Sequence, residues 1–226
     1  MRIIHVSGSP GSGKTTLGEQ LSKLPNTVVI DTDSILQEED HQQLAFFWGA
    51  CLHKEGEEFR EKCMTKRIND VIEEHKEADL IIFTGILNHL SPNGITLEFP
   101  FINAEKYFIN IEAIQLLKQS YGRFVSLLET DPKFASDITS GRYVLDSSKD
   151  FLEQSQREKE WHLSKNYVVA TSNQITRIVT GELTPGPCSV CPKLCISACS
   201  HCMGRRYCSK ECQLIDWPVY QKWCRK

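Results

Sequence analysis

The sequence lacks any apolar run that approaches the ~20 residues needed to cross a bilayer. The segment that starts at Ser7 is rich in serine, glycine and lysine. The apolar stretch before it is therefore too short to be the core of a secretion signal. We therefore expect an intracellular protein, cytoplasmic or nuclear, without a membrane partner. Hydrophobic and charged residues make up 40% and 24% of the 226 residues, which excludes a fibrous or disordered chain and predicts an apolar core.

Cysteine is scarce in the first 187 residues, which contain only Cys51 and Cys63, whereas 8 of the 10 cysteines lie in the last 39 residues. The charge changes at the same place. Residues 188–226 carry 7 lysines and arginines against 2 acidic residues, and the preceding part carries 19 against 27. This division predicts two domains. Because metal-bound thiolates would cancel much of the positive charge, we predict no nucleic-acid partner.

Short β-branched runs alternate with helical patterns in the first domain, which predicts an α/β fold with a parallel sheet and helices on both faces. The predicted strands are Arg2–Val6, Thr27–Ile30, Leu80–Phe83, Tyr107–Ile111 and Tyr167–Ala170. A segment with two glycines and two prolines, GELTPGP, closes this domain. We place the first domain at residues 1–182, a linker at 183–187 and the second domain at 188–226.

The segment GSPGSGKT at residues 8–15 satisfies the pattern GxxxxGK[ST] between a predicted strand and a predicted helix. Glycines allow such a loop to wrap around an anion, so that its N–H groups face a phosphate. Lys14 then adds charge toward the transferring phosphate, and the Thr15 hydroxyl holds Mg²⁺. The alternatives are a turn without ligand and a loop that has lost its activity. The predicted ATP-binding residues are Gly8, Ser9, Pro10, Gly11, Ser12, Gly13, Lys14, Thr15 and Thr16.

Two carboxylates, Asp31 and Asp33, follow the second predicted strand at the end where ligands of an open α/β sheet gather. Both side chains point to one side of an extended segment. One carboxylate, which we assign to Asp31, would support the Mg²⁺ shell, and Asp33 would orient or deprotonate an acceptor hydroxyl. The alternative is helix capping by Asp33 or Ser34.

These features resemble the small-molecule and nucleotide kinases of the P-loop class, including adenylate kinase-like and shikimate kinase-like enzymes, over residues 1–182. The resemblance also rests on Phe108-Ile-Asn110, followed by a helix that we expect to end at Tyr121-Gly-Arg123. It implies that Arg123 contacts ATP or its transferring phosphate and that residues 124–150 form a lid. Arg142 or Arg157 would add further charge there.

The chain departs from nucleoside monophosphate kinases after the third strand, where residues 83–87 (FTGIL) lack the arginine that grips an acceptor phosphate in that family. A monophosphate acceptor is therefore disfavoured. The stretch between Asp33 and Ala78 would close over the acceptor by resemblance, although its aromatic residues 46–48 are also typical of a core. Arg60 and Arg67 lie among glutamates and are predicted to form surface ion pairs.

The paired cysteines of the second domain have the close spacing that tetrahedral zinc requires. A disulfide scaffold is the alternative, and it would need an oxidising compartment. Because this segment is short, it has too little apolar sequence to fold alone. Metal binding would therefore supply its folding free energy. The cysteines in this pattern are Cys188, Cys191, Cys199, Cys202, Cys208, Cys212 and Cys224.

This spacing, with Tyr207-Cys208-Ser-Lys-Glu-Cys212 and Asp216-Trp217, resembles a MYND zinc finger over residues 188–224. The resemblance implies two interleaved zinc ions, with Cys188, Cys191, Cys208 and Cys212 at the first and Cys199, Cys202 and Cys224 at the second. Tyr220 stands where the family has histidine, and a phenol with pKa ~10 is a poor zinc ligand. We expect a weakened second site, completed by Cys195 rather than by His201, Tyr220 or water.

Two functions remain open. In the first, the protein is an ATP- and Mg²⁺-dependent phosphotransferase with Lys14, Asp33 and Arg123 at the reacting groups and an unknown small-molecule acceptor. In the second, it is a nucleotide-binding adaptor that phosphorylates no acceptor. A GTPase is a weaker third reading, since no NKxD-type motif is present.

By resemblance the finger recruits a protein partner, including proline-containing peptides, through a groove near Gln213, Trp217 and Trp223.

Overall fold

The computed structural model describes residues 1–85, 103–140 and 148–224, apart from the side chains of Asp33 and Trp48. Its elements in the sheet-bearing part are β1 (Arg2–Ser7), α1 (Lys14–Leu21), β2 (Thr27–Asp31), the 3-10 turn η1 (Thr32–Ser34), α2 (Glu38–Gly49), α3 (His53–Glu74), β3 (Leu80–Thr84), β4 (Glu105–Ile109), α4 (Ala113–Thr130), α5 (Pro132–Thr139), α6 (Ser148–Ser164), β5 (Val168–Ala170) and α7 (Ser172–Val179). The remaining elements are β6 (Gly186–Pro187), β7 (Leu194–Cys195) and α8 (Lys210–Tyr220). None of the helices in these ranges is both long and apolar enough to cross a membrane.

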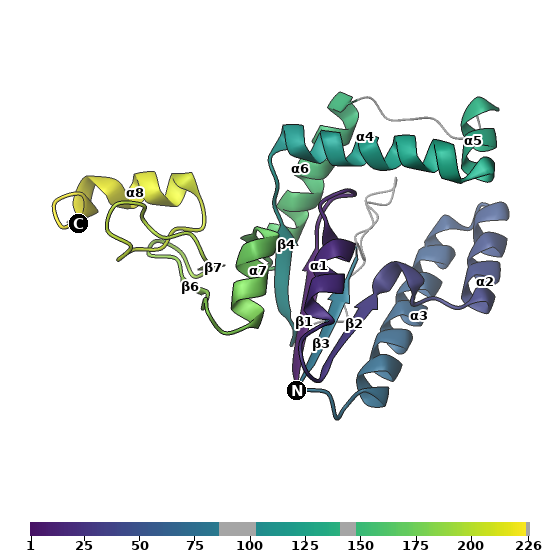
Figure 1. Cartoon of the computed structure of the whole chain (residues 1–226), viewed down its shortest axis with the longest axis horizontal. Coiled ribbons are helices and arrows are strands. Elements are labelled where there is room, and N and C mark those ends of the chain that lie inside the picture. The colour runs from purple at the N-terminus through teal and green to yellow at the C-terminus, as the bar shows by residue number, and fades with distance from the viewer. Residues whose placement is uncertain (86–102, 141–147, 225–226) are drawn as a thin grey trace.

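The main sheet has five strands in the order β2-β3-β1-β4-β5, and every neighbouring pair is parallel (Figure 1). Each predicted strand overlaps one of these five, so the predicted α/β class is confirmed. The order places β1 at the centre, between β3 and β4. Helices connect β1 to β2, β2 to β3 and β4 to β5, and they cover both faces of the sheet.

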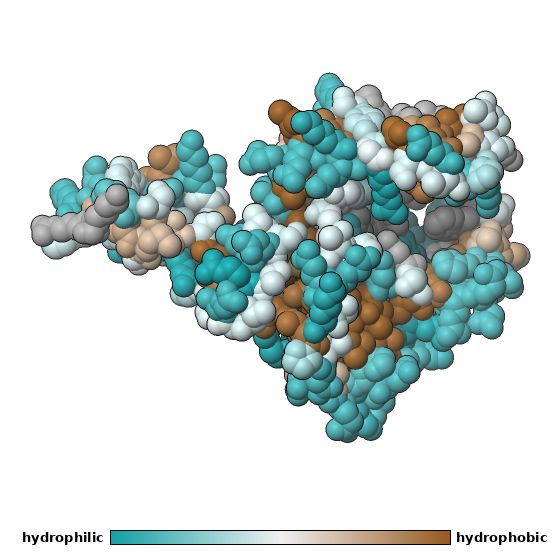
Figure 2. Space-filling model, viewed as in Figure 1, coloured by the Kyte–Doolittle hydropathy of each residue, from teal (hydrophilic) through white to brown (hydrophobic). Residues whose placement is uncertain are grey.

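The two faces of the sheet bury different sets of side chains because alternate residues of a strand point to opposite faces. On one face, Ile4, Val6 and Ile82 pack with side chains of α1 and α7. On the other face, Ile81 and Phe83 pack with side chains of α3. Figure 2 shows larger apolar areas on the sheet-bearing part of the molecule than on the smaller lobe.

The smaller lobe begins with an antiparallel hairpin of β6 and β7 and ends with α8 (Figure 1). β7 lies beside β5, the last strand of the main sheet. Ile196, directly after β7, is buried in the same cluster as Ile4 and Val6, and Leu183 packs against that cluster. The lobe is therefore joined to the sheet by apolar contacts as well as by the chain.

Candidate nucleotide and metal sites

The loop between β1 and α1 has the backbone that an anion cradle requires. Gly11 and Gly13 have φ values of 78° and 90°, in the left-handed region that favours glycine. A Cβ on Gly11 would lie 2.5 Å from the Ser120 hydroxyl oxygen, so a larger residue would also collide with α4. Gly13 is the N-cap of α1, and no side chain caps this helix end. The N–H groups of the first turn can therefore face an anion.

Lys14 is folded back onto the loop. Its ammonium nitrogen Nζ donates to the carbonyl oxygens of Gly8, at 2.6 Å, and Ser9, at 3.2 Å. The predicted residues Thr15 and Thr16 lie exposed in the first turn of α1, whereas Ser12 is buried. The structure thus brings all the predicted loop residues to the carboxyl end of the central strand.

Helix α6 also packs against the loop between β1 and α1. The Ser155 and Ser9 hydroxyl oxygens are 2.6 Å apart, and Lys159 donates to the Asn110 side chain at 2.9 Å. Glu158 is buried, and burial raises the pKa of its carboxyl group, although a hydrogen bond with Ser9 opposes that shift. A cavity of about 460 Å³ lies here, lined by residues of the loop, β4, α4 and α6.

Asp31 lies at the carboxyl end of β2, paired in register with Thr84 at the end of β3. Asp33 belongs to η1, and its side chain lies outside the described part of the structure. A Cβ on Gly85, whose φ is 144°, would overlap the hydroxyl of the buried Thr32. Glycine therefore lets the segment after β3 approach η1 closely.

Four cysteine sulfurs of the smaller lobe lie together, because the sulfur atoms of Cys188, Cys191, Cys208 and Cys212 are all within 4.8 Å of one another. The Cys191–Cys208 and Cys208–Cys212 sulfur distances are 3.4 and 3.5 Å. Thiolates around one tetrahedral zinc ion, at about 2.3 Å from it, lie about 3.8 Å apart. The four thiols therefore fit one such ion.

Cys199, Cys202 and Cys224 form a second group by the same criterion, and the Cys199 and Cys224 sulfurs are 3.7 Å apart. Tyr220 contributes a further polar atom, because its hydroxyl oxygen is 2.8 Å from the Cys202 sulfur. The two groups interleave along the chain, as the resemblance to a MYND finger implies.

Two family models match the chain: the shikimate kinase model matches residues 10–95, and the MYND finger model matches residues 188–224. The chain joins a kinase-like P-loop domain to a MYND finger. The finger match and the cysteine groups support zinc binding. The predicted resemblances to a P-loop kinase and to a MYND finger are thus confirmed.

Among solved structures, shikimate kinase from Acinetobacter baumannii in complex with shikimate is similar to this chain, with 15% sequence identity and a TM-score of 0.46. That alignment covers 80% of this chain and 94% of the shikimate kinase. No curated protein matches the chain.

Cys195 does not belong to the second thiol group of the MYND finger, contrary to expectation. It is buried on β7, and its pKa is raised to about 11, first by burial and then by the charge of Cys188, a member of the first group. His201 is exposed and belongs to neither group. The hairpin explains this arrangement, because β7 turns Cys195 toward the first group.

The lid side of the kinase-like domain differs from the expectation. Helix α4 does not end at Tyr121-Gly-Arg123 but continues to Thr130, so Arg123 lies exposed within the helix. Gly122 fails to end the helix because α4 has a strong apolar periodicity that continues beyond it. Arg157 is exposed on α6, and Arg142 lies outside the described residues. The stretch 124–150 contains the end of α4, α5 and the start of α6.

Arg67 forms an ion pair with Asp40 that joins α3 to α2, with a nitrogen–oxygen distance of 3.0 Å and exposed side-chain fractions of 21% and 11%. The predicted surface pair is therefore wrong for Arg67, because the two helices cover it. Burial by itself would raise the pKa of Asp40, but the Gln37 N–H group and the Arg67 guanidinium hold it below its usual value. Phe47 packs against Phe59 of α3, while Phe46 is exposed.

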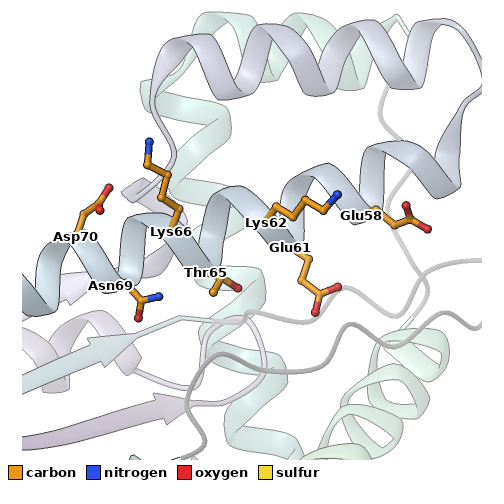
Figure 3. Close-up of a pocket in the computed structure, with 7 residues that line it drawn as sticks. All are labelled: Glu58, Glu61, Lys62, Thr65, Lys66, Asn69 and Asp70. Atoms are coloured by element: carbon orange, nitrogen blue, oxygen red, sulfur yellow. The ribbon is translucent and has the colours of Figure 1, made fainter.

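An open groove of about 650 Å³ lies along α3 and is lined by charged and polar side chains (Figure 3). Figure 3 shows Lys62 and Lys66 on the same helix as Glu58, Glu61 and Asp70. Spacing in the sequence did not single out this face, nor Ser155 and Glu158 of α6. The place of Ser155 beside the loop depends on packing between segments that are far apart in the chain, whereas the residues that line the groove all lie on α3.

Proposed function

We propose that the kinase-like domain transfers the γ-phosphate of Mg-ATP to a hydroxyl group of a small molecule. The observation that carries this proposal is the loop after β1, in which two left-handed glycines expose the N-terminus of α1 beside Lys14. The match of residues 10–95 to the shikimate kinase model adds support, because it extends from this loop through β2, α2 and α3. A simple glycine-rich turn would not require that extended similarity.

In this proposal each residue acts by its place around the loop. The backbone N–H groups of residues 8–16 bind the phosphates, and Lys14 leaves the carbonyl oxygens of Gly8 and Ser9 to contact the transferring phosphate. The Thr15 hydroxyl and Asp31 hold Mg²⁺, which neutralises charge on the phosphates when bound. Asp33 orients the acceptor hydroxyl, and Arg123 binds phosphate when the lid helices close.

The acceptor is proposed to be an alcohol rather than a phosphate. Thr84 ends β3 and Gly85 follows it, where a phosphate-gripping arginine would be needed, and the close approach of Thr32 leaves no room for a side chain at residue 85. Lys62 and Lys66 lie on the groove of α3 together with Glu58, Glu61 and Asp70, so this groove has no excess of positive charge. Small hydroxylated molecules are the first acceptors to test, with shikimate among them because the shikimate kinase model matches residues 10–95.

A nucleotide-binding adaptor is the second candidate, and the packing of α6 favours it. Ser155 contacts Ser9 of the loop, and the buried carboxyl group of Glu158 lies near enough to Lys14 for the lysine charge to lower its pKa. A loop held in this way would bind phosphate only after α6 moves. In the adaptor, nucleotide binding would change the conformation of the smaller lobe, which binds a partner. No acceptor would be phosphorylated.

The deciding experiment measures ADP release from Mg-ATP by the full chain, alone and with pools of hydroxylated acids, nucleosides and nucleoside monophosphates. A kinase shows acceptor-dependent turnover, and Lys14→Ala abolishes it. Lys23→Ala, which changes an exposed lysine just after α1, serves as the matched control and retains full turnover. ATP binding in titration calorimetry with no response to any pool would favour the adaptor, and absence of ATP binding would contradict both.

We also propose that the finger recruits a protein partner through α8 and the turn that follows it. Ile215, Val219 and Trp223 have 67%, 68% and 71% of their surface exposed, which is unusual for large apolar side chains near one another in sequence. Binding of proline-containing peptides would be measured by titration calorimetry on the zinc-loaded chain. Trp223→Ala is expected to weaken binding at least about tenfold, whereas substitution of the exposed Val125 of α4 would leave it unchanged.

A further inference from the structure

Two helices contact the loop between β1 and α1 through serine hydroxyl groups. On α6, the Ser155 hydroxyl oxygen lies 2.6 Å from that of Ser9. On α4, the Ser120 hydroxyl donates to the Pro10 carbonyl at 3.0 Å. Ser9 is only 3% exposed, although it belongs to a loop that is proposed to bind phosphate. A phosphate that reaches this part of the loop must therefore replace contacts that are already made.

Lys14 is engaged in the same contact. Its Nζ donates to the Gly8 carbonyl at 2.6 Å, and the buried carboxyl group of Glu158 on α6 lies near enough for the lysine charge to lower its pKa. Opposite charges that lie close together partly cancel the field that either one presents to a third group. Glu158 thus competes with a phosphate for the charge of Lys14.

The packing of α6 leaves several buried polar atoms unsatisfied. Glu158 Oε1 accepts from Gln154 at 3.4 Å, but Glu158 Oε2 has no hydrogen-bond partner among the described residues. Within the same described ranges, the Ser12 hydroxyl of the loop and His162 Nε2 of α6 also have none. Burial of such atoms without partners costs free energy, most of all for a carboxylate. A competing ligand can therefore open this contact.

We propose that α6 is an autoinhibitory helix, in which Ser155 and Glu158 hold the loop and the charge of Lys14 in a closed state that phosphate must open. This inference rests on the proposed binding of nucleotide by the loop, and it applies to the kinase and to the adaptor alike. In the open state, Lys14 contacts the phosphates and Ser155 leaves Ser9. The apparent affinity for ATP is therefore reduced by the fraction of chains that are closed.

The first test measures the affinity of the full chain for Mg-ATP by titration calorimetry. Ser155→Ala removes the hydroxyl contact and should tighten binding by about threefold to tenfold, which is the effect of one net hydrogen bond. Glu158→Gln keeps the shape of the side chain but removes its charge, and it should tighten binding by at least about tenfold.

Ser164→Ala and Glu160→Gln are the matched controls on the same helix. The Ser164 hydroxyl donates to the Trp161 carbonyl of α6 itself, and Glu160 is exposed. Both variants should bind Mg-ATP as the wild type does.

Stopped-flow mixing with a fluorescent ATP analogue separates the release of a closed loop from the gain of a new contact. If α6 holds the loop closed, both variants raise the association rate constant and leave the dissociation rate constant unchanged, because more chains are open before ATP arrives. Slower dissociation at an unchanged association rate would indicate a new contact with bound ATP and would overturn the proposal.

Unchanged or weaker binding in either Ser155→Ala or Glu158→Gln would also overturn it, while leaving nucleotide binding by the loop intact. Absence of ATP binding in the wild type and in both variants would contradict nucleotide binding itself, and this inference with it.

Discussion

The sheet of residues 2–179 and the finger of residues 186–224 bury different kinds of side chain. In the sheet, large aliphatic and aromatic residues such as Ile4, Ile82 and Phe83 have no exposed surface. In the finger, the buried residues are Cys188, Cys195, Cys199, Ile196 and Tyr207. The comparison shows that the sheet is stabilised by apolar burial, whereas the finger has too few apolar residues and depends on the metal that its thiols bind.

The two parts are nevertheless in contact, since Ile196 of the finger is buried in the core cluster that includes Val6 of the sheet. A cavity of about 580 Å³ adjoins this contact and is lined by residues of both parts, with Tyr167 on one side and Tyr207 on the other. The finger therefore has a fixed place beside β5. The following predictions test how far its stability is separate from that of the sheet.

Removal of zinc should have the largest effect. Structural zinc contributes about 10–16 kcal/mol to small zinc-binding folds, so a strong chelator should unfold the finger. Hydrogen exchange is expected to show loss of protection in residues 186–224 and retained protection in β1, β3 and β4. Cys208→Ser should give the same pattern. Loss of protection in the sheet strands would show that both parts unfold as one unit.

Ile82→Ala should destabilise the sheet by about 3–4 kcal/mol, since this side chain is fully buried and its loss leaves a cavity. Urea unfolding followed by circular dichroism measures the loss, and the zinc content should stay as in the wild type. Val125→Ala, at a position with 52% exposure on α4, should change stability by less than about 0.5 kcal/mol. Release of zinc from the Ile82→Ala protein at neutral pH would contradict the separation of the two parts.

Ile196→Ala tests the contact between them. We expect a loss of about 2–3 kcal/mol, because the side chain is 7% exposed at the edge of the core cluster. Differential scanning calorimetry should show lower transition temperatures for both the sheet and the finger. A lower transition for the sheet alone would mean that the finger gains no stability from its place beside β5.

Acid should weaken the sheet through a buried histidine. Burial lowers the pKa of His162 to about 4, below the ordinary value of about 6.5. The unfolded chain then binds the proton more readily, so stability falls as the pH drops from about 6.5 toward 4. The expected loss from His162 between pH 7 and pH 5 is about 2 kcal/mol, and His5, whose pKa is also lowered by burial, adds to it.

Urea unfolding at both pH values checks this loss, and His162→Leu should reduce the difference between them. His41→Leu, at an exposed position on α2, is the control and should leave the difference unchanged. Equal pH dependence in the wild type and the His162→Leu protein would show that other groups cause the acid effect.

Local sequence was sufficient to predict several features. The five strands followed from β-branched runs, because such runs favour strands wherever they pack. The loop at residues 8–15 followed from its motif, and the interleaved thiol groups followed from the resemblance to a MYND finger. The assignment of individual residues to phosphate, Mg²⁺ or zinc stays a prediction.

Other features depended on contacts between distant segments. The end of α4 was predicted too early, because the apolar packing of that helix outweighed one glycine at residue 122. The packing of Ser155 and Glu158 against the loop left no mark in the sequence, since nothing near either residue indicates which segment it will face.

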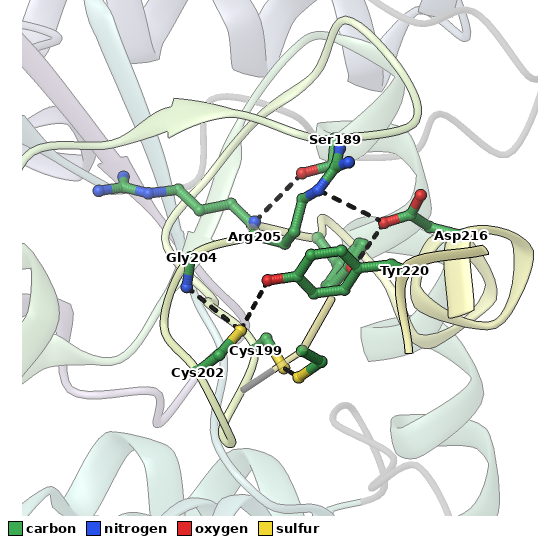
Figure 4. Close-up of polar contacts among 10 residues, drawn as sticks. Ser189, Cys199, Cys202, Gly204, Arg205, Asp216 and Tyr220 are labelled. Atoms are coloured by element: carbon green, nitrogen blue, oxygen red, sulfur yellow. Dashed lines mark hydrogen bonds and ion pairs between the residues drawn. The ribbon is translucent and has the colours of Figure 1, made fainter. Parts of the chain in front are cut away.

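By itself, the sequence predicted the parallel sheet from its alternation of strand and helix patterns and the phosphate-binding loop from its motif, and its resemblance to a MYND finger implied two groups of thiols. Tertiary structure decided that Cys195 is turned toward the first group and that the Tyr220 hydroxyl meets the Cys202 sulfur (Figure 4). It also decided that Ile196 joins the finger to the core of the sheet. These contacts arise only when separate elements pack, and only packing determines which polar and apolar groups share a buried space.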